Sequence, residues 1–155
     1  MSVEQKLAAR GLALPTAPQP LGAYKAVVES QGMLYISAQV PIRDGKVVFQ
    51  GRVGVDLTLE QGQQAAELTA LNALAQIHRY LGDFDRLVRI VRVEGHVASA
   101  DGFFDQPKVI DGASNLYADV LGEKAGHVRS AFSHTQLPAN SAVVLAVTAE
   151  IAPAA

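Results

Sequence analysis

The chain has 155 residues and no cysteine, and its 13 basic and 15 acidic side chains give a formal net charge of −2. This length predicts a single domain, residues 1–155, whose core needs no disulfides, and the missing cysteines exclude thiolate metal sites and thiol nucleophiles. The acidic balance disfavours a nucleic-acid partner, and without a membrane-length apolar run or a recognisable signal peptide we expect a cytoplasmic protein with no membrane partner.

The first 50 residues are predicted to form one short helix followed by strands and turns. Ser2-Val3-Glu4-Gln5 is a capping box that begins a helix ending near Arg10. Pro15, Pro18 and Pro20 then enforce an extended linker, so the helix and linker together occupy residues 1–20. Strands are expected at 24–29, 33–40 and 46–49, with turns between them.

Two long helices and three more strands are predicted in the rest of the chain. Thr58-Leu59-Glu60-Gln61 is a second capping box, and its helix runs to about Leu81 before Gly82. Pro107 suits the first turn of another helix, whose apolar residues keep a 3.6-residue period up to Leu121. Strands are expected at 87–98, 129–133 and 143–151. This order predicts an α+β sandwich with two long helices on one face of a sheet.

The second face of the sheet is expected to be covered as well. Little polar alternation is visible around its apolar positions, which are Val88, Ile90, Val143, Leu145 and Val147. Only 18% of the residues are charged, whereas ordinary domains have about 25%. Apolar surface on a small chain with few charges indicates a covering partner. We therefore expect an oligomer in which other subunits pack on this face.

Sequence motifs for common cofactors and catalytic devices are missing. The four histidines, His78, His96, His127 and His134, lack metal-ligand spacing, so each is expected to be a surface or core residue and no metal is predicted. No serine lies in a G-x-S-x-G elbow, and no P-loop or dinucleotide-binding glycine motif is present. Gly51-Arg52-Val53-Gly54 is too short to cradle a phosphate and is predicted to be a turn.

One arginine lies where a buried charge would need a partner. Arg129 is part of the mostly apolar segment 128–132, and an unpaired buried charge is very costly. A salt bridge to a carboxylate of the same chain, or an extension to solvent, would satisfy it. The alternative is a site for a small carboxylate ligand, which a guanidinium binds through two parallel hydrogen bonds. The residue pattern leaves both interpretations open.

Several segments in the right order resemble the YjgF/RidA family of reactive-intermediate deaminases, also described as L-PSP endoribonucleases. Gly22-Ala23-Tyr24 is similar to its Gly-x-Tyr segment, and residues 34–41 are similar to its Ser-Gly-Gln strand. The middle and C-terminal signatures are resembled by Gly51-x-Val53, Gln63, Asn72, Leu81-Gly82, Arg129-Ser130 and Leu137-Pro138. The resemblance extends over residues 21–151.

The resemblance implies a chorismate-mutase-like α+β fold with a mixed sheet, assembled as a homotrimer with clefts between subunits. It also implies hydrolysis of small enamine or imine intermediates, such as 2-aminoacrylate, to 2-keto acids and ammonia without a cofactor. Arg129 has the position of the arginine that binds the substrate carboxylate. The other residues that the resemblance places at the substrate are Tyr24, Ser37, Ala38, Gln39, Ser130, Ala131 and either Ser114 or Asn115.

Three residues depart from the family pattern. Ala146 aligns with a glutamate that handles the water, and Glu150 lies about 13 Å further along a strand. Ala38 replaces the glycine of the Ser-Gly-Gln strand, and Ala131 stands where close relatives have cysteine. These departures indicate a divergent subgroup. Two functions are therefore considered, an enamine/imine deaminase and a non-catalytic trimer that binds a small carboxylate metabolite in the same clefts.

Overall fold

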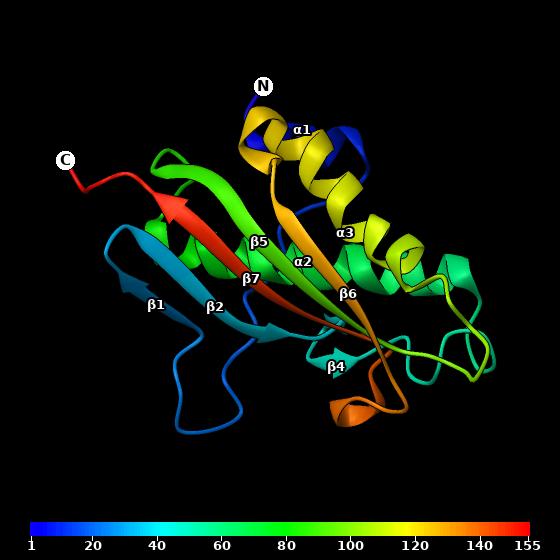
Figure 1. Cartoon of the computed structure of the whole chain (residues 1–155). Coiled ribbons are helices and arrows are strands. Elements are labelled where there is room, and N and C mark those ends of the chain that lie inside the picture. Colours follow the sequence, from blue (N-terminus) through cyan, green and yellow to red (C-terminus); the bar gives the residue numbers. More distant parts are fainter.

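The computed structural model describes residues 1–155, which form one sheet with helices packed on one of its faces (Figure 1). The helices are α1 (Val3–Ala9), α2 (Leu59–Leu81) and α3 (Gln106–Leu121), and the 3-10 turns are η1 (Gly122–Ala125) and η2 (Pro138–Asn140). The sheet contains β1 (Val27–Ser30), β2 (Met33–Gln39), β5 (Leu87–Ala98), β6 (Val128–His134) and β7 (Val143–Ile151). A separate two-stranded ribbon consists of β3 (Ile42–Arg43) and β4 (Lys46–Val47).

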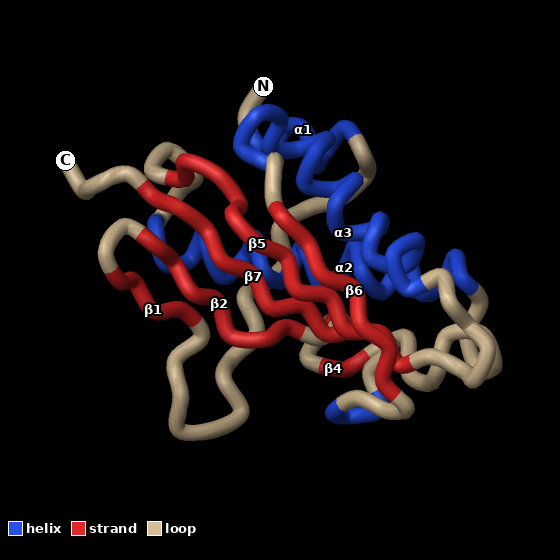
Figure 2. Tube along the Cα trace, viewed as in Figure 1, coloured by secondary structure: helices blue, strands red, loops and turns tan.

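The strands lie in the order β1-β2-β7-β5-β6, so β1 and β6 are the two edges of the sheet (Figure 2). β5 and β6 are parallel because α3 crosses over between them, while all other neighbours are antiparallel. The predicted α+β fold with a mixed sheet and two long helices on one face is thereby confirmed.

Most predicted elements are confirmed within a few residues, and both capping boxes form. The hydroxyls of Ser2 and Thr58 each accept the backbone N–H three residues later at 3.1 Å. Two strand predictions are wrong in part. The first strand begins at Val27 rather than at residue 24, because residues 21–24 form a loop in which the Tyr24 hydroxyl accepts the Leu21 N–H. The segment 46–49 pairs outside the sheet and stops before Phe49, whose φ of +56° ends an extended run.

The core lies between the helices and the sheet, and α2 and α3 approach each other very closely within it. Gly112 of α3 lies against the backbone of Gln63 in α2, where a Cβ atom would be 2.1 Å from the Gln63 carbonyl oxygen. Tyr117 is fully buried, and its hydroxyl donates to the Ala70 carbonyl at 3.1 Å. These contacts fix the position of α3, the helix that carries Asp111 and Ser114. No helix has the combination of length and apolar character that a bilayer span requires.

The uncovered face of the sheet is more polar than predicted. Ile90, Val143, Leu145 and Val147 all point to the helices and are at most 2% exposed, so the expected lack of polar alternation on the other face was wrong. Arg92, Glu94 and Thr148 alternate with such apolar residues along β5 and β7. Apolar side chains are still present there, since Tyr35 and Phe132 are about half exposed.

Candidate functional site

Arg129 lies on the edge strand β6 and points to the helix side of the sheet. Its Nη1 donates to Asp111 Oδ1 at 2.7 Å and to Ser114 Oγ at 3.2 Å, and both partners belong to α3. The salt bridge within the chain that the sequence offered as one interpretation is thus present. The guanidinium nevertheless keeps donors for a ligand, because its Nε and Nη2 have no hydrogen-bond partner in the chain and a quarter of the side chain is exposed.

A second chain of hydrogen bonds begins at the same serine. Ser114 Oγ lies 2.9 Å from His127 Nε2, and His127 Nδ1 lies 2.5 Å from the Ala125 carbonyl oxygen. The ring of Tyr117 contacts the imidazole edge to face, with 6.2 Å between ring centroids. The residues Asp111, Arg129, Ser114 and His127 are partly exposed, and we call them the arginine cluster.

The other residues predicted near Arg129 take different positions. Asn115 is exposed and lines a hollow together with Arg10, Gln63 and Glu67, so only Ser114 of the two helix candidates contacts Arg129. Ala131 shares the helix side of β6 with Arg129 and packs against the core. Ser130 points to the opposite face, where its hydroxyl accepts from Arg92 Nη2 at 2.7 Å.

The remaining predicted residues gather at a pocket beside β2, three strands away from β6. Tyr24, Ser37, Ala38 and Gln39 line a pocket of about 240 Å³, which we call the tyrosine pocket. Its wall is completed by the end of the proline-rich linker, by Gln76 of α2, by Pro138 and by Val144 of β7. No charged side chain lines it.

Local structure explains how β2 forms one wall of this pocket. The register of β2 against β7 shifts between Ile36 and Gln39, which leaves Ala38 exposed at the irregularity. Ser37 Oγ donates to the Lys25 carbonyl at 2.6 Å and thereby ties the strand to the Tyr24 loop. Gln39 and Gln76 are buried, and Gln76 Nε2 donates to the Pro18 carbonyl at 2.6 Å. These bonds hold the linker, the loop and the strand as one unit.

The arginine cluster and the tyrosine pocket do not meet within one chain. Three inter-strand spacings separate β2 from β6, which amounts to about 14 Å. In addition, Val144 in the pocket stands opposite His96 on the uncovered face, whereas Arg129 points to the helices. Apart from Ser130 and Asn115, the predicted site residues therefore fall into two separate groups, one at the edge strand β6 and one at β2.

The last strand brings no carboxylate to either group. Ala146 stands opposite Glu94 on the uncovered face, and Val144, two residues earlier on the same face, is the β7 residue that lines the tyrosine pocket. The Glu94 carboxylate lies 3.0 Å from His96 Nε2, and His96 Nδ1 lies 2.7 Å from His134 Nε2. The Glu94 carboxylate is therefore bonded to His96 on the uncovered face, away from Arg129.

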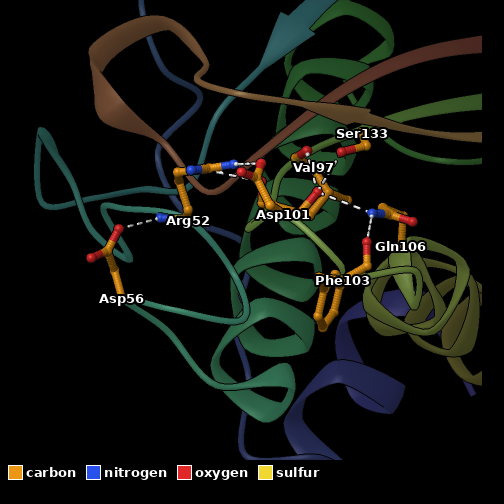
Figure 3. Close-up of polar contacts among 8 residues, drawn as sticks. Arg52, Asp56, Val97, Asp101, Phe103, Gln106 and Ser133 are labelled. Carbon is orange, nitrogen blue, oxygen red and sulfur yellow. Dashed lines mark hydrogen bonds and ion pairs between the residues drawn. The ribbon is translucent and has the colours of Figure 1, made fainter.

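A third polar cluster surrounds Ser99, the residue directly after β5, and includes Arg52, Gln106 and Ser133 (Figure 3). Arg52 donates from Nε and Nη2 to the Ser99 carbonyl at 3.0 and 2.5 Å, and Ser99 Oγ contacts Ser133 Oγ of β6 at 2.7 Å. Gln106, the first residue of α3, donates to Ser99 Oγ at 3.1 Å and to the Phe103 carbonyl at 2.7 Å. This Ser99 cluster joins β6 to the start of α3. These two elements carry Arg129, Asp111 and Ser114 of the arginine cluster.

Hydrogen bonds in the same region fix the conformation of residues 51–54. Their four backbone N–H groups donate to Asn140 O, Asp56 Oδ2, Ala98 O and Leu57 O, which leaves none for an anion. The predicted turn is confirmed in part, since the turn begins at Gly54, whereas Val53 forms isolated bridges with Leu57 and Ser99. Nor does the chain hold a group of three His, Asp or Glu side chains that could bind a metal ion.

Two functional candidates, Asp111 and His127, were missed by the sequence predictions, although the spacing carries a signal for each. Asp111 and Ser114 are three residues apart, which places them on one face of a helix. His127 and Arg129 are two residues apart in extended chain, which places them on one side. Neither spacing shows that the helix pair Asp111 and Ser114 contacts the pair His127 and Arg129. The packing of α3 against β6 brings the two pairs together.

Comparisons with known proteins converge on one family. Residues 4–151 match the family described as "YjgF/chorismate mutase-like, putative endoribonuclease". Protein TCP17 of Trypanosoma cruzi is 37% identical over 142 residues, covering 91% of this chain and 89% of that protein. The crystal structure of Atu1372, a protein of unknown function from Agrobacterium tumefaciens, is 40% identical with a TM-score of 0.92, covering 97% and 92% of the two chains. The fold is also that of Escherichia coli TdcF with bound serine, at 17% identity and a TM-score of 0.63, covering 88% and 94%.

Proposed function

Because the chain belongs to the YjgF/RidA family, we propose that it is a homotrimeric hydrolase that converts small enamine or imine intermediates to 2-keto acids and ammonia. In this proposal the active sites lie in clefts between subunits. Each cleft pairs the arginine cluster of one subunit with the tyrosine pocket of its neighbour.

The single observation that carries this proposal is the division of the site residues into two groups. Two different surfaces of one chain can meet through a head-to-tail contact between copies, and such a contact forms a ring when its rotation closes. A ring of three is the assembly that the family resemblance implies. The small volume of the tyrosine pocket, about 240 Å³, agrees with half of a site, since complete ligand sites enclose roughly 300–1,000 Å³.

The chemistry of the two groups suits a small 2-imino acid. The free Nε and Nη2 donors of Arg129 match the two oxygens of a carboxylate and would fix its orientation. The polar groups of Tyr24 and Ser37 would then face the nitrogen end of the molecule. An imine carbon is electrophilic without a cofactor, so orientation and a positioned water supply much of the rate enhancement. The serine bound to TdcF supports a small amino-acid-like ligand for this fold.

A second function is favoured by one observation. No acidic side chain lines the tyrosine pocket, and the position that the resemblance assigns to a glutamate is Ala146. A trimer with an arginine anchor and no water-activating group would bind a carboxylate metabolite without hydrolysing it. The two functions make the same prediction for binding and opposite predictions for turnover.

The first experiment measures turnover and binding separately. A PLP-dependent dehydratase generates 2-aminoacrylate in place, and keto-acid release is followed with and without the protein. We expect acceleration by the wild type and its loss in Arg129→Ala, with Arg89→Ala as the matched control because Arg89 pairs with Glu150 away from both groups. Carboxylate binding by wild type without acceleration would establish the non-catalytic function instead.

The second experiment tests the shared cleft directly. Arg129→Ala and Tyr24→Ala subunits, each inactive alone, are co-expressed and purified as mixed trimers. In a head-to-tail ring, random mixing restores about a quarter of the clefts to the wild-type pair of surfaces. We expect activity near this fraction. A mixture as inactive as its parents, or a monomer in light scattering, would contradict the inter-subunit site.

A further inference from the structure

The hydrogen bonds around His127 determine which of its nitrogens carries the proton. The Ala125 carbonyl oxygen can only accept, so the His127 Nδ1 that lies 2.5 Å from it must donate. In the neutral imidazole the lone pair is then on Nε2, 2.9 Å from Ser114 Oγ. The hydroxyl proton of Ser114 points to this lone pair, because Ser114 Oγ already accepts from Arg129 Nη1. The direction of every bond in this chain is therefore fixed by its end groups.

The hydrogen-bonded chain from Ser114 through His127 to Ala125 has the arrangement that activates a hydroxyl group in enzymes. A hydroxyl lies within hydrogen-bond distance of a base, and the base is oriented by a third group on its other nitrogen. The hydroxyl also contacts the guanidinium that would hold the substrate carboxylate. We propose that Ser114 and His127 form a proton relay for hydrolysis at the Arg129 anchor. This inference rests on the proposed function and identifies the groups that handle the water.

The relay accounts for each proton of the reaction. As the water oxygen bonds to the imine carbon, one water proton passes to Ser114 Oγ while the serine proton passes to His127 Nε2. The electron pair of the C=N bond moves to nitrogen, which takes a proton back through Ser114 to give the carbinolamine. The remaining hydroxyl proton leaves by the same route and is delivered to the nitrogen. The C–N bond then breaks, ammonia departs and the carbonyl forms, with no net change in the protein.

Of the bases near Arg129, only His127 contacts a hydroxyl. Asp111 is held by Arg129 Nη1 in an ion pair, and a carboxylate in that pair orients the guanidinium. Glu94, His96 and His134 form their own chain on the uncovered face. The tyrosine pocket supplies no charged side chain. His127 is thus the base of the arginine cluster that is bonded to a hydroxyl.

The ionisable groups around the imidazole come from three elements. Arg129 of β6 and Asp111 of α3 act on it through Ser114, and Tyr117 of α3 packs against its ring. Lys124 of η1 directs its amine to the Phe84 carbonyl. The relay needs an unprotonated Nε2 to accept the serine proton, so it predicts that kcat/KM falls on the acid side of the pH profile, as general-base catalysis requires.

The test uses a variant that keeps the hydrogen bond and removes the proton transfer. In His127→Gln an amide oxygen can still accept the Ser114 proton, but the amide cannot take it up. We expect about a 100-fold loss of kcat, within the usual contribution of acid–base catalysis, together with loss of the acid-side fall in the pH profile. Ser114→Ala should lose a similar factor, and the double variant should lose no more than either single one.

Controls separate this outcome from damage to the fold. His78→Gln makes the same substitution at a histidine beside Glu4 and Phe84 and should leave the pH profile unchanged. Melting temperatures of all variants should stay near that of the wild type. A His127→Gln enzyme with wild-type kcat and an unchanged acid limb would overturn the relay and leave the proposed function standing. A wild type without deaminase activity would overturn both.

Discussion

Replacing Gly112 with alanine tests the packing that holds the arginine cluster in place. An ideal Cβ atom at this position would lie 2.1 Å from the Gln63 carbonyl oxygen, 2.9 Å from its carbon and 3.1 Å from the Gln63 Cα. All three are backbone atoms of α2, so no side-chain rotation can relieve the contact. The two helices must instead separate by about 1 Å or more, since heavy atoms pack at about 3.5 Å.

Two opposing terms determine the size of the effect. Overpacking of a well-packed core costs about 1–3 kcal/mol and sometimes more, and a clash with backbone belongs at the upper end of this range. Alanine offsets about 1 kcal/mol of it, because glycine in a helix interior is less favourable by that amount. We expect a net loss of about 2 kcal/mol, which lowers the melting temperature of a chain of this length by about 4–8 °C.

Calorimetry or circular dichroism at one fixed protein concentration measures the shift, because an oligomer melts in a concentration-dependent way. Gly126→Ala is the matched control, since Gly126 has a φ of −66° and no atom within 4 Å of the added Cβ. Gly112→Ala should also weaken carboxylate binding, because Asp111 and Ser114 flank residue 112 on α3. A melting temperature equal to or above that of the wild type would refute the close helix contact.

Two further predictions concern Tyr117 and Asp111. Burial raises the pKa of the Tyr117 phenol well above its ordinary value. Above about pH 10 the unfolded chain therefore releases the phenol proton while the folded chain keeps it. The contribution of Tyr117 to the free energy of unfolding is complete below about pH 10 and is lost as the pH rises further. Tyr117→Phe should flatten this alkaline loss in urea titrations while costing about 1 kcal/mol at pH 7 for the bond to Ala70. Asp111→Asn keeps an oxygen for Arg129 Nη1 and removes a negative charge, so calorimetry should show about threefold tighter carboxylate binding; weaker binding would mean that the charge is needed to orient the guanidinium.

The long elements could be predicted from sequence because their signals are local. The capping box at Thr58 and the left-handed Gly82 delimit α2, and β-branched runs delimit β5 and β7. The predictions of the short strands were partly wrong because the bounds of a short strand depend on its pairing partner. Residues 46–49 are extended only as far as β3 gives them a neighbour. Of residues 24–26, only Ala26 has a backbone bond to β2, because its carbonyl accepts the Ser37 N–H.

The candidate site was predictable only in part, for a related reason. Arg129 could be singled out because a charge in an apolar segment needs a partner. Its partner Asp111 lies 18 residues away, and only the packing of α3 against β6 brings the two together. The orientation of Ser130 follows from strand alternation, which directs adjacent side chains to opposite faces. The separation of Tyr24 from Arg129 depends on strand order, which no local pattern encodes.

The Asp111–Arg129 pair bears on the choice between an enzyme and a binding protein. The pair is partly exposed, so it adds about 0–1 kcal/mol to stability. It does not need to break when a ligand binds, because the Nε and Nη2 donors of Arg129 are free. Its negative charge lies beside the guanidinium that would bind a substrate carboxylate, and the Asp111→Asn prediction above is that this charge lowers the affinity for anions. A protein selected to retain a carboxylate would gain by losing this charge. An enzyme gains nothing from uniform tight binding of its ground state. If the Asp111→Asn prediction holds, a guanidinium kept weak by its own carboxylate, next to an oriented hydroxyl and imidazole, is what the proposed enzyme would use and what a storage protein would not.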